Sequence, residues 1–127
     1  ATALADQAGT IEKTGNGCQL TWGHDGTYLY EINHGGRMEN ALYKIDAATY
    51  DKKLWFDAPG DYSHEYFPKA ANTGDILVYG ASSEGHEHDS ADYEIFMWII
   101  DDPKPIRITY HTGNDCWPDV FVQKPRP

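Results

Sequence analysis

Residues 20–26 read Leu-Thr-Trp-Gly-His-Asp-Gly and lead into the alternating apolar run Tyr-Leu-Tyr-Glu-Ile at 28–32. Shifted by 48 residues, Pro-Lys-Ala-Ala-Asn-Thr-Gly at 68–74 leads into Ile-Leu-Val-Tyr at 76–79. In both places a strand reaches a tight turn that ends in glycine, and a second strand leaves that turn. Asp-Gly in the first turn and Thr-Gly in the second supply residues that accept the positive φ of hairpin turns. The sequence therefore contains an internal repeat built on β-hairpins.

Two further aromatic or apolar strands follow each hairpin. The third strand is expected at 41–46 in the first repeat and at 94–99 in the second. The fourth is expected at 52–56 and at 106–110. Four short antiparallel strands that recur about every 48–50 residues predict propeller-type blades. No helix is expected, because the repeat alignment outweighs the helical spacing near residue 45.

The repeat continues at both ends of these two units. Thr-Gly-Asn-Gly-Cys at 14–18 recurs as Thr-Gly-Asn-Asp-Cys at 112–116, and 118–122 matches the start of another inner strand. Residues 9–13 resemble the outer strand of a preceding unit. We therefore expect an all-β fold of two four-stranded antiparallel propeller-type blades plus one extra strand at each end. It forms a single domain over 1–127, with a first blade and its preceding outer strand at 11–57, a second blade at 62–112 and the start of a further blade at 114–122.

The pattern resembles the TolB-like, WD40-like (PD40) β-propeller repeats. Blades of that family run as Pro-x-Trp-Ser-Pro-Asp-Gly, a strand, then Glu-Ile-Tyr and an Asp-rich turn. The first repeat keeps Trp22, Asp25 and Gly26 of this signature, and the second keeps Pro68 and Gly74. The later signature recurs as Glu94-Ile95-Phe96 and Asp101-Asp102. The resemblance covers residues 10–122 and implies an exported propeller; because two blades cannot close a ring, it also implies further blades.

Composition and charge indicate which classes of partner and which cellular compartment to expect. With 20 acidic and 10 basic residues, the net charge of −10 argues against nucleic acid, whose binding depends on Lys and Arg replacing counterions. The longest apolar run, at 95–100, is only strand-sized, so no membrane span is expected. Ala-Thr-Ala-Leu-Ala at 1–5 resembles the region around the cleavage site of an export signal. We expect an extracytoplasmic protein, either periplasmic or secreted.

A histidine-rich acidic loop is the candidate metal site. It lies at 82–92, between the second and third strands of the second repeat, where the first repeat has a shorter loop. Two histidines at i and i+2 point the same way in an extended chain, and nearby carboxylates could complete the site for a divalent metal. The alternative is a solvated acidic hairpin tip, because loop tips collect such residues. The candidate ligands are His86, His88, Glu84 and Asp89.

Four residues near the expected strand ends are the candidate ligand-binding residues, with a glycan as one possible ligand. Most tryptophans lie inside expected strands, where packing between blades is the default. The family resemblance implies that His64 faces the end of the propeller where ligands bind. Adjacent residues Ser63-His64-Glu65 cannot form a catalytic triad, which needs convergence from separated positions. The ligand candidates are Tyr62, His64, Tyr66 and Trp117.

The two cysteines, Cys18 and Cys116, occupy equivalent positions two repeats apart. In a closed propeller such positions lie beyond the Cα separation of about 7 Å that a disulfide tolerates. We therefore expect the thiols to be free or to bond between chains.

These features favour a non-catalytic, exported binding or assembly module. Its incomplete edges would pair with other copies of itself or with a larger protein, giving a ring, a filament or a larger propeller. One alternative is part of a metal-dependent propeller enzyme that acts on polysaccharide. The other is a glycan- or protein-binding propeller fragment. The enzyme is less favoured, because neither a catalytic base nor an arginine clamp is found and fold similarity alone does not establish activity.

Overall fold

The computed structural model describes residues 2–5, 11–85, 87–110 and 113–123, and within them the chain is all-β without a helix. The described residues accordingly contain no helix that could span a membrane. The strands are β1 (Thr2–Ala5), β2 (Ile11–Gly15), β3 (Cys18–Trp22), β4 (Tyr28–His34), β5 (Asn40–Asp46), β6 (Lys52–Phe56), β7 (His64–Ala70), β8 (Ile76–Ser82), β9 (Glu94–Ile99) and β10 (Ile106–Arg107).

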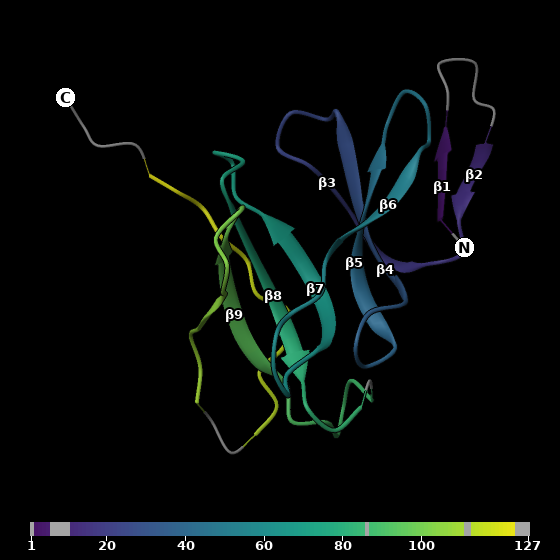
Figure 1. The fold of residues 1–127 in the computed structure, drawn as a ribbon. Coiled ribbons are helices and arrows are strands. Elements are labelled where there is room, and N and C mark those ends of the chain that lie inside the picture. The colour runs from purple at the N-terminus through teal and green to yellow at the C-terminus, as the bar shows by residue number, and fades with distance from the viewer. Residues whose placement is uncertain (1, 6–10, 86, 111–112, 124–127) are drawn as a thin grey trace.

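Two four-stranded antiparallel sheets form the body of the molecule (Figure 1). The first sheet has the order β3-β4-β5-β6 and the second has the order β7-β8-β9-β10, so neighbours in sequence are neighbours in each sheet. Strand β7 contacts β3, β4 and β5, which places the second sheet against one face of the first. The expected pair of four-stranded units is confirmed.

The repeat extends to individual hydrogen bonds. In the first sheet the β3–β4 turn closes with a bond from the Gly23 amide to the Tyr28 carbonyl at 2.8 Å. In the second sheet the β7–β8 turn closes with a bond from the Ala71 amide to the Ile76 carbonyl, also at 2.8 Å. The glycine that ends each turn has a positive φ, 74° in the first and 79° in the second. Both turns therefore form as the Asp-Gly and Thr-Gly pairs predict.

A backbone irregularity recurs three times along the chain. Gln19, Phe67 and Trp117 have φ values of 53°, 54° and 53°, and they lie 48 and 50 residues apart. In the first two cases the residue sits in a β-bulge of the first strand of its sheet. Trp117 carries the same conformation in the C-terminal segment, at the position that the sequence repeat makes equivalent to Gln19 and Phe67.

Aromatic side chains fill the space between the two sheets. Phe56 stacks on Trp98 with ring centroids 4.3 Å apart, and Trp98 also meets Trp55 edge-on at 5.1 Å. Tyr79 stacks on its cross-strand partner Phe96 at 5.7 Å. These large buried surfaces hold the sheets together, since each buried aromatic ring removes much apolar area from water.

Three details differ from the expectations at the sheet edges. The N-terminal strand β2 is not alone, because it pairs with β1 in a separate two-stranded sheet. Residues 117–122 form no strand, although they begin with the recurrent bulge conformation. Trp22 is 52% exposed rather than packed between sheets, because the strand register places it on the outer face of the first sheet.

Candidate functional site

Equivalent positions of the three repeats meet at the first strands of the sheets. Cys18 and Tyr66 directly precede the first two bulges, and the Cys18 thiol lies 3.8 Å from the Tyr66 hydroxyl. Burial, and then the neighbouring Cys18, raise the pKa of Tyr66 to about 12. Cys116 directly precedes Trp117, the third recurrent positive-φ residue, and its thiol lies 3.8 Å from the backbone carbonyl of His88. Both cysteines are free thiols.

The side chain of His88, in the acidic loop, packs into this cluster. Its ring meets Tyr66 at 4.6 Å and Phe67 at 5.1 Å between centroids, in edge-on contacts. Its Nε2 atom is buried and has no hydrogen-bond partner among the described residues. The loop turns at residues 88–90 instead of extending, so the i, i+2 alternation expected for an extended chain does not apply here. His88 therefore faces the aromatic core.

The other candidate metal ligands are not gathered around His88. Glu84 and Asp89 are exposed, and His86 lies outside the described residues. Among the residues that the structure describes, no three His, Cys, Asp or Glu side chains are placed to hold a metal.

Asp92 fixes the base of the acidic loop. Its carboxylate accepts hydrogen bonds from the Ser82 hydroxyl at 2.7 Å, the Ser83 amide at 2.9 Å and the Glu84 amide at 3.1 Å. Burial alone would raise the pKa of Asp92, but the bonds from Ser83 and Ser82 outweigh it and hold the pKa below its usual value. This residue therefore has a structural role in the loop.

The four candidate ligand-binding residues do not come together in one site. Tyr62 packs on Phe96 at 5.7 Å, in contact with the inner face of the second sheet. His64 is buried at the start of β7. Tyr66 lies in the cluster with Cys18, and Trp117 is 67% exposed while its ring leans on Phe67 at 5.1 Å. Tyr66 and Trp117 thus flank the same bulge, whereas Tyr62 lies elsewhere.

A hollow of about 240 Å³ opens beside Trp117. Its walls are residues 19–21, 67–69 and 117–119, each of which contains one of the recurrent positive-φ residues Gln19, Phe67 and Trp117. The sequence repeat could have identified this hollow, because its walls are one position of the repeat taken three times. Segments from all three repeats therefore line this candidate binding region.

Burial of carboxyl groups is the feature that sequence reasoning missed. Glu31, Glu65 and Glu94 are all buried, although strand alternation gives no reason to expect it for acids. Glu94 is paired with the Arg107 guanidinium at 2.8 Å, and Glu31 with the Lys52 ammonium.

Among the described residues, no cation forms an ion pair with Glu65. Its Oε1 accepts a hydrogen bond from the Ala58 amide, while its Oε2 and the Tyr79 hydroxyl have no partner among the described residues. Burial raises the pKa of Glu65 to about 8, so the carboxyl is largely protonated at neutral pH. The Glu65 side chain is fully buried, so it cannot contact a ligand at the surface. Its protonation state affects the stability of the fold instead.

Comparisons with known proteins assign no family: no protein-family model matches the chain, and none of the curated proteins matches it significantly.

Proposed function

We propose that the two sheets are neighbouring blades of a TolB-like, propeller-type assembly, and that the chain is a non-catalytic assembly module that pairs with other copies of itself. The observation that carries the proposal is the hollow of about 240 Å³ between residues 19–21, 67–69 and 117–119. Segments that occupy one position in successive repeats surround a common hollow when the repeats are arranged around an axis. That is the arrangement of propeller blades.

The outer face of each sheet carries large apolar side chains that are exposed at its edges, although its centre is covered: Leu29 and Ile45 of the first sheet are buried. On the second sheet, Ile99 and Ile106 are 41% and 49% exposed, and the register places them on the side opposite the packed ring of Tyr79. On the first sheet, Trp22 and Leu54 are 52% and 47% exposed on its outer face. A partner that covered these side chains would bury apolar surface on both sides of the packed pair of sheets and so gain stability.

The internal repeat indicates that a second copy of this chain can pack against these outer faces. The outer face of the second sheet is equivalent to the face that the first sheet packs against it. The outer face of the first sheet is in turn equivalent to the packed face of the second. The first sheet of one copy therefore matches the second sheet of another, using the kind of contact already present within one chain. Such head-to-tail contact is heterologous and gives a ring or a filament.

Two interface variants test this proposal when mixed. Ile106→Lys places a charge on the outer face of the second sheet, and Trp22→Lys does the same on the first. Each variant alone loses one of the two faces that a homotypic contact needs, so each is expected to be monomeric. An equimolar mixture retains one intact face on each partner and is expected to form a heterodimer and nothing larger, as measured by native mass spectrometry.

The control is Tyr50→Asn, which changes an exposed aromatic residue in the β5–β6 turn, away from both outer faces. This variant should associate like the unmodified chain. The proposal is wrong if the mixture of the two lysine variants stays monomeric while the unmodified chain associates. It is equally wrong if each lysine variant alone associates as the unmodified chain does.

A further inference from the structure

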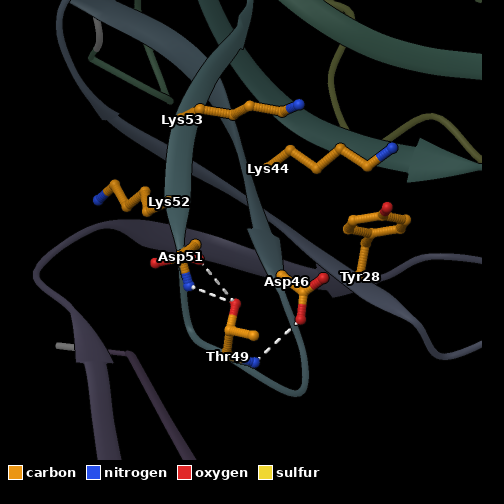
Figure 2. A pocket seen from close by; sticks show the side chains of 7 residues that line it. All are labelled: Tyr28, Lys44, Asp46, Thr49, Asp51, Lys52 and Lys53. Carbon is orange, nitrogen blue, oxygen red and sulfur yellow. Dashed lines mark hydrogen bonds between the residues drawn. The ribbon is translucent and has the colours of Figure 1, made fainter.

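A second hollow lies beside the turn between β5 and β6 (Figure 2). Its volume is about 300 Å³, at the lower end of the range that holds small ligands. Three of the ten basic residues of this acidic chain line it. The lining side chains are Tyr28, Lys44, Asp46, Thr49, Asp51, Lys52 and Lys53.

Two of these lysines are placed against each other, and neither has an ion-pair partner within 4.0 Å among the described residues. Lys44 and Lys53 are direct cross-strand partners on β5 and β6, an arrangement that is destabilising for like charges. Among the described residues, the ion pairs within 4.0 Å involve other cations, including Lys52 with Glu31. Figure 2 shows the side chains of Lys44 and Lys53 pointing to one side of the strands and that of Lys52 pointing to the opposite side.

Aromatic rings hold the Lys44 ammonium in place. Its Nζ lies 3.7 Å from the centroid of Tyr28, 5.3 Å from that of Trp55 and 6.0 Å from that of Tyr30. These cation–π contacts fix its position and do not neutralise its charge. Burial, and then the charge of Lys53, lower the pKa of Lys44, and the more weakly acting charges of Asp101 and Asp25 oppose this shift without cancelling it.

The two carboxylates of the hollow are engaged in the turn. Asp46 accepts hydrogen bonds from the Ala48 and Thr49 amides, both at 2.9 Å. Asp51 accepts a hydrogen bond from the Thr49 hydroxyl at 3.0 Å. Figure 2 shows both groups beside this turn, below the two lysine ammonium groups. They stabilise the turn, and among the described residues neither forms an ion pair within 4.0 Å with Lys44 or Lys53.

The fold does not require lysine at these two positions. In the second sheet the equivalent cross-strand pair is Met97 and Ile106. The equivalence follows from the register, since Lys44 lies opposite Tyr30 and Met97 lies opposite Val78, 48 residues further along. One repeat thus has an apolar pair where the other places two positive charges.

We propose that Lys44 and Lys53 bind the oxyanion of a small organic acid, such as the carboxylate of an acidic sugar, in the hollow beside Tyr28. The anion relieves the repulsion between the two ammonium groups and forms charge-assisted hydrogen bonds with both. The hollow is built from the first sheet alone, so this binding does not depend on the assembly of copies.

The test is an NMR titration of the full chain with glucuronate at constant ionic strength, with glucose as the neutral control. Saturable shifts are expected for the amides of residues 44–53 with glucuronate and not with glucose. Lys44→Met combined with Lys53→Ile copies the pair of the second sheet and should therefore fold. We expect it to melt at the same or a higher temperature and to bind at least about tenfold more weakly.

Lys104→Met, at an exposed lysine in the β9–β10 turn, is the matched control and should bind like the unmodified chain. Lys53→Ala is a second, milder variant, because Lys53 is exposed, and it should also weaken binding about tenfold. The proposal is overturned if glucuronate gives no saturable shift, or if glucose gives the same shift. Unchanged affinity in either site variant would also overturn it.

Discussion

The side-chain amide of Asn72 forms two hydrogen bonds with the backbone of Val122, one as donor and one as acceptor. Its Nδ2 donates to the Val122 carbonyl at 3.2 Å, and its Oδ1 accepts from the Val122 amide at 2.8 Å. The two residues lie 50 positions apart, which is one repeat. The β3–β4 turn and the β7–β8 turn also lie against each other, since a Cβ atom on Gly74 would lie 2.3 Å from the His24 ring. Successive repeats therefore contact one another at the same turn.

Removing this amide should loosen the C-terminal segment. Asn72→Ala deletes both hydrogen bonds to Val122, and we expect a loss of about 1 kcal/mol because the bonds lie at the surface. Faster hydrogen exchange at the Val122 amide is the measurement. The amide of Asp115, which bonds to the Tyr93 carbonyl at 2.8 Å, is the internal control and should exchange at its original rate. An unchanged rate at Val122 would show that the side chain does not hold the segment.

Glu65 makes stability depend on pH. The carboxyl ionises near its ordinary pKa of 4.5 in the unfolded chain and near 8 in the folded one. Between these values the unfolded state holds fewer protons, so stability falls as pH rises, by up to about 1.4 kcal/mol per pH unit. The effect is absent below pH 4.5 and complete above pH 8. Urea unfolding at a series of pH values measures this slope.

The matching variant is Glu65→Gln, which keeps the shape and removes the ionisation. It should flatten the slope and raise stability above pH 7, whereas Glu87→Gln, at an exposed loop residue, should leave the slope unchanged. If Glu65→Gln retained the full pH dependence, the slope would have to come from another group.

The structural features that could be predicted from the sequence are those that neighbouring residues determine. Both hairpin turns depend on residues next to one another, and a glycine with positive φ identifies each of them. The direction of His88 depends instead on Tyr66, Phe67 and a loop that turns rather than extends. The Lys44–Lys53 pair likewise becomes visible only through the register of β5 and β6. Contacts that depend on strand register and on loop conformation were therefore the part that pattern reasoning could not supply.

The two thiols should differ in reactivity. Cys18 is exposed, whereas Cys116 is half-buried, and burial followed by the charges of Asp115 and Asp89 raises the pKa of its thiol. Since the thiolate is the reactive form, Ellman's reagent at pH 7.5 should label Cys18 first. Cys116→Ser should keep the fast phase and Cys18→Ser should lose it. Equal rates in the two single variants would contradict this order.

The mass of the chain in solution tests the central claim, which is that the outer faces of the two sheets pair with other copies. A monomer has a mass of 14.3 kDa and a net charge of −10, so copies repel one another at low salt. Salt screens this repulsion and leaves the apolar faces free to pair. Light scattering should therefore give a mass above 14.3 kDa that increases with protein and salt concentration, while Ile106→Lys stays monomeric. A constant mass of 14.3 kDa for the unmodified chain across concentrations and up to about 1 M salt, where the Debye length is about 3 Å, would contradict the claim.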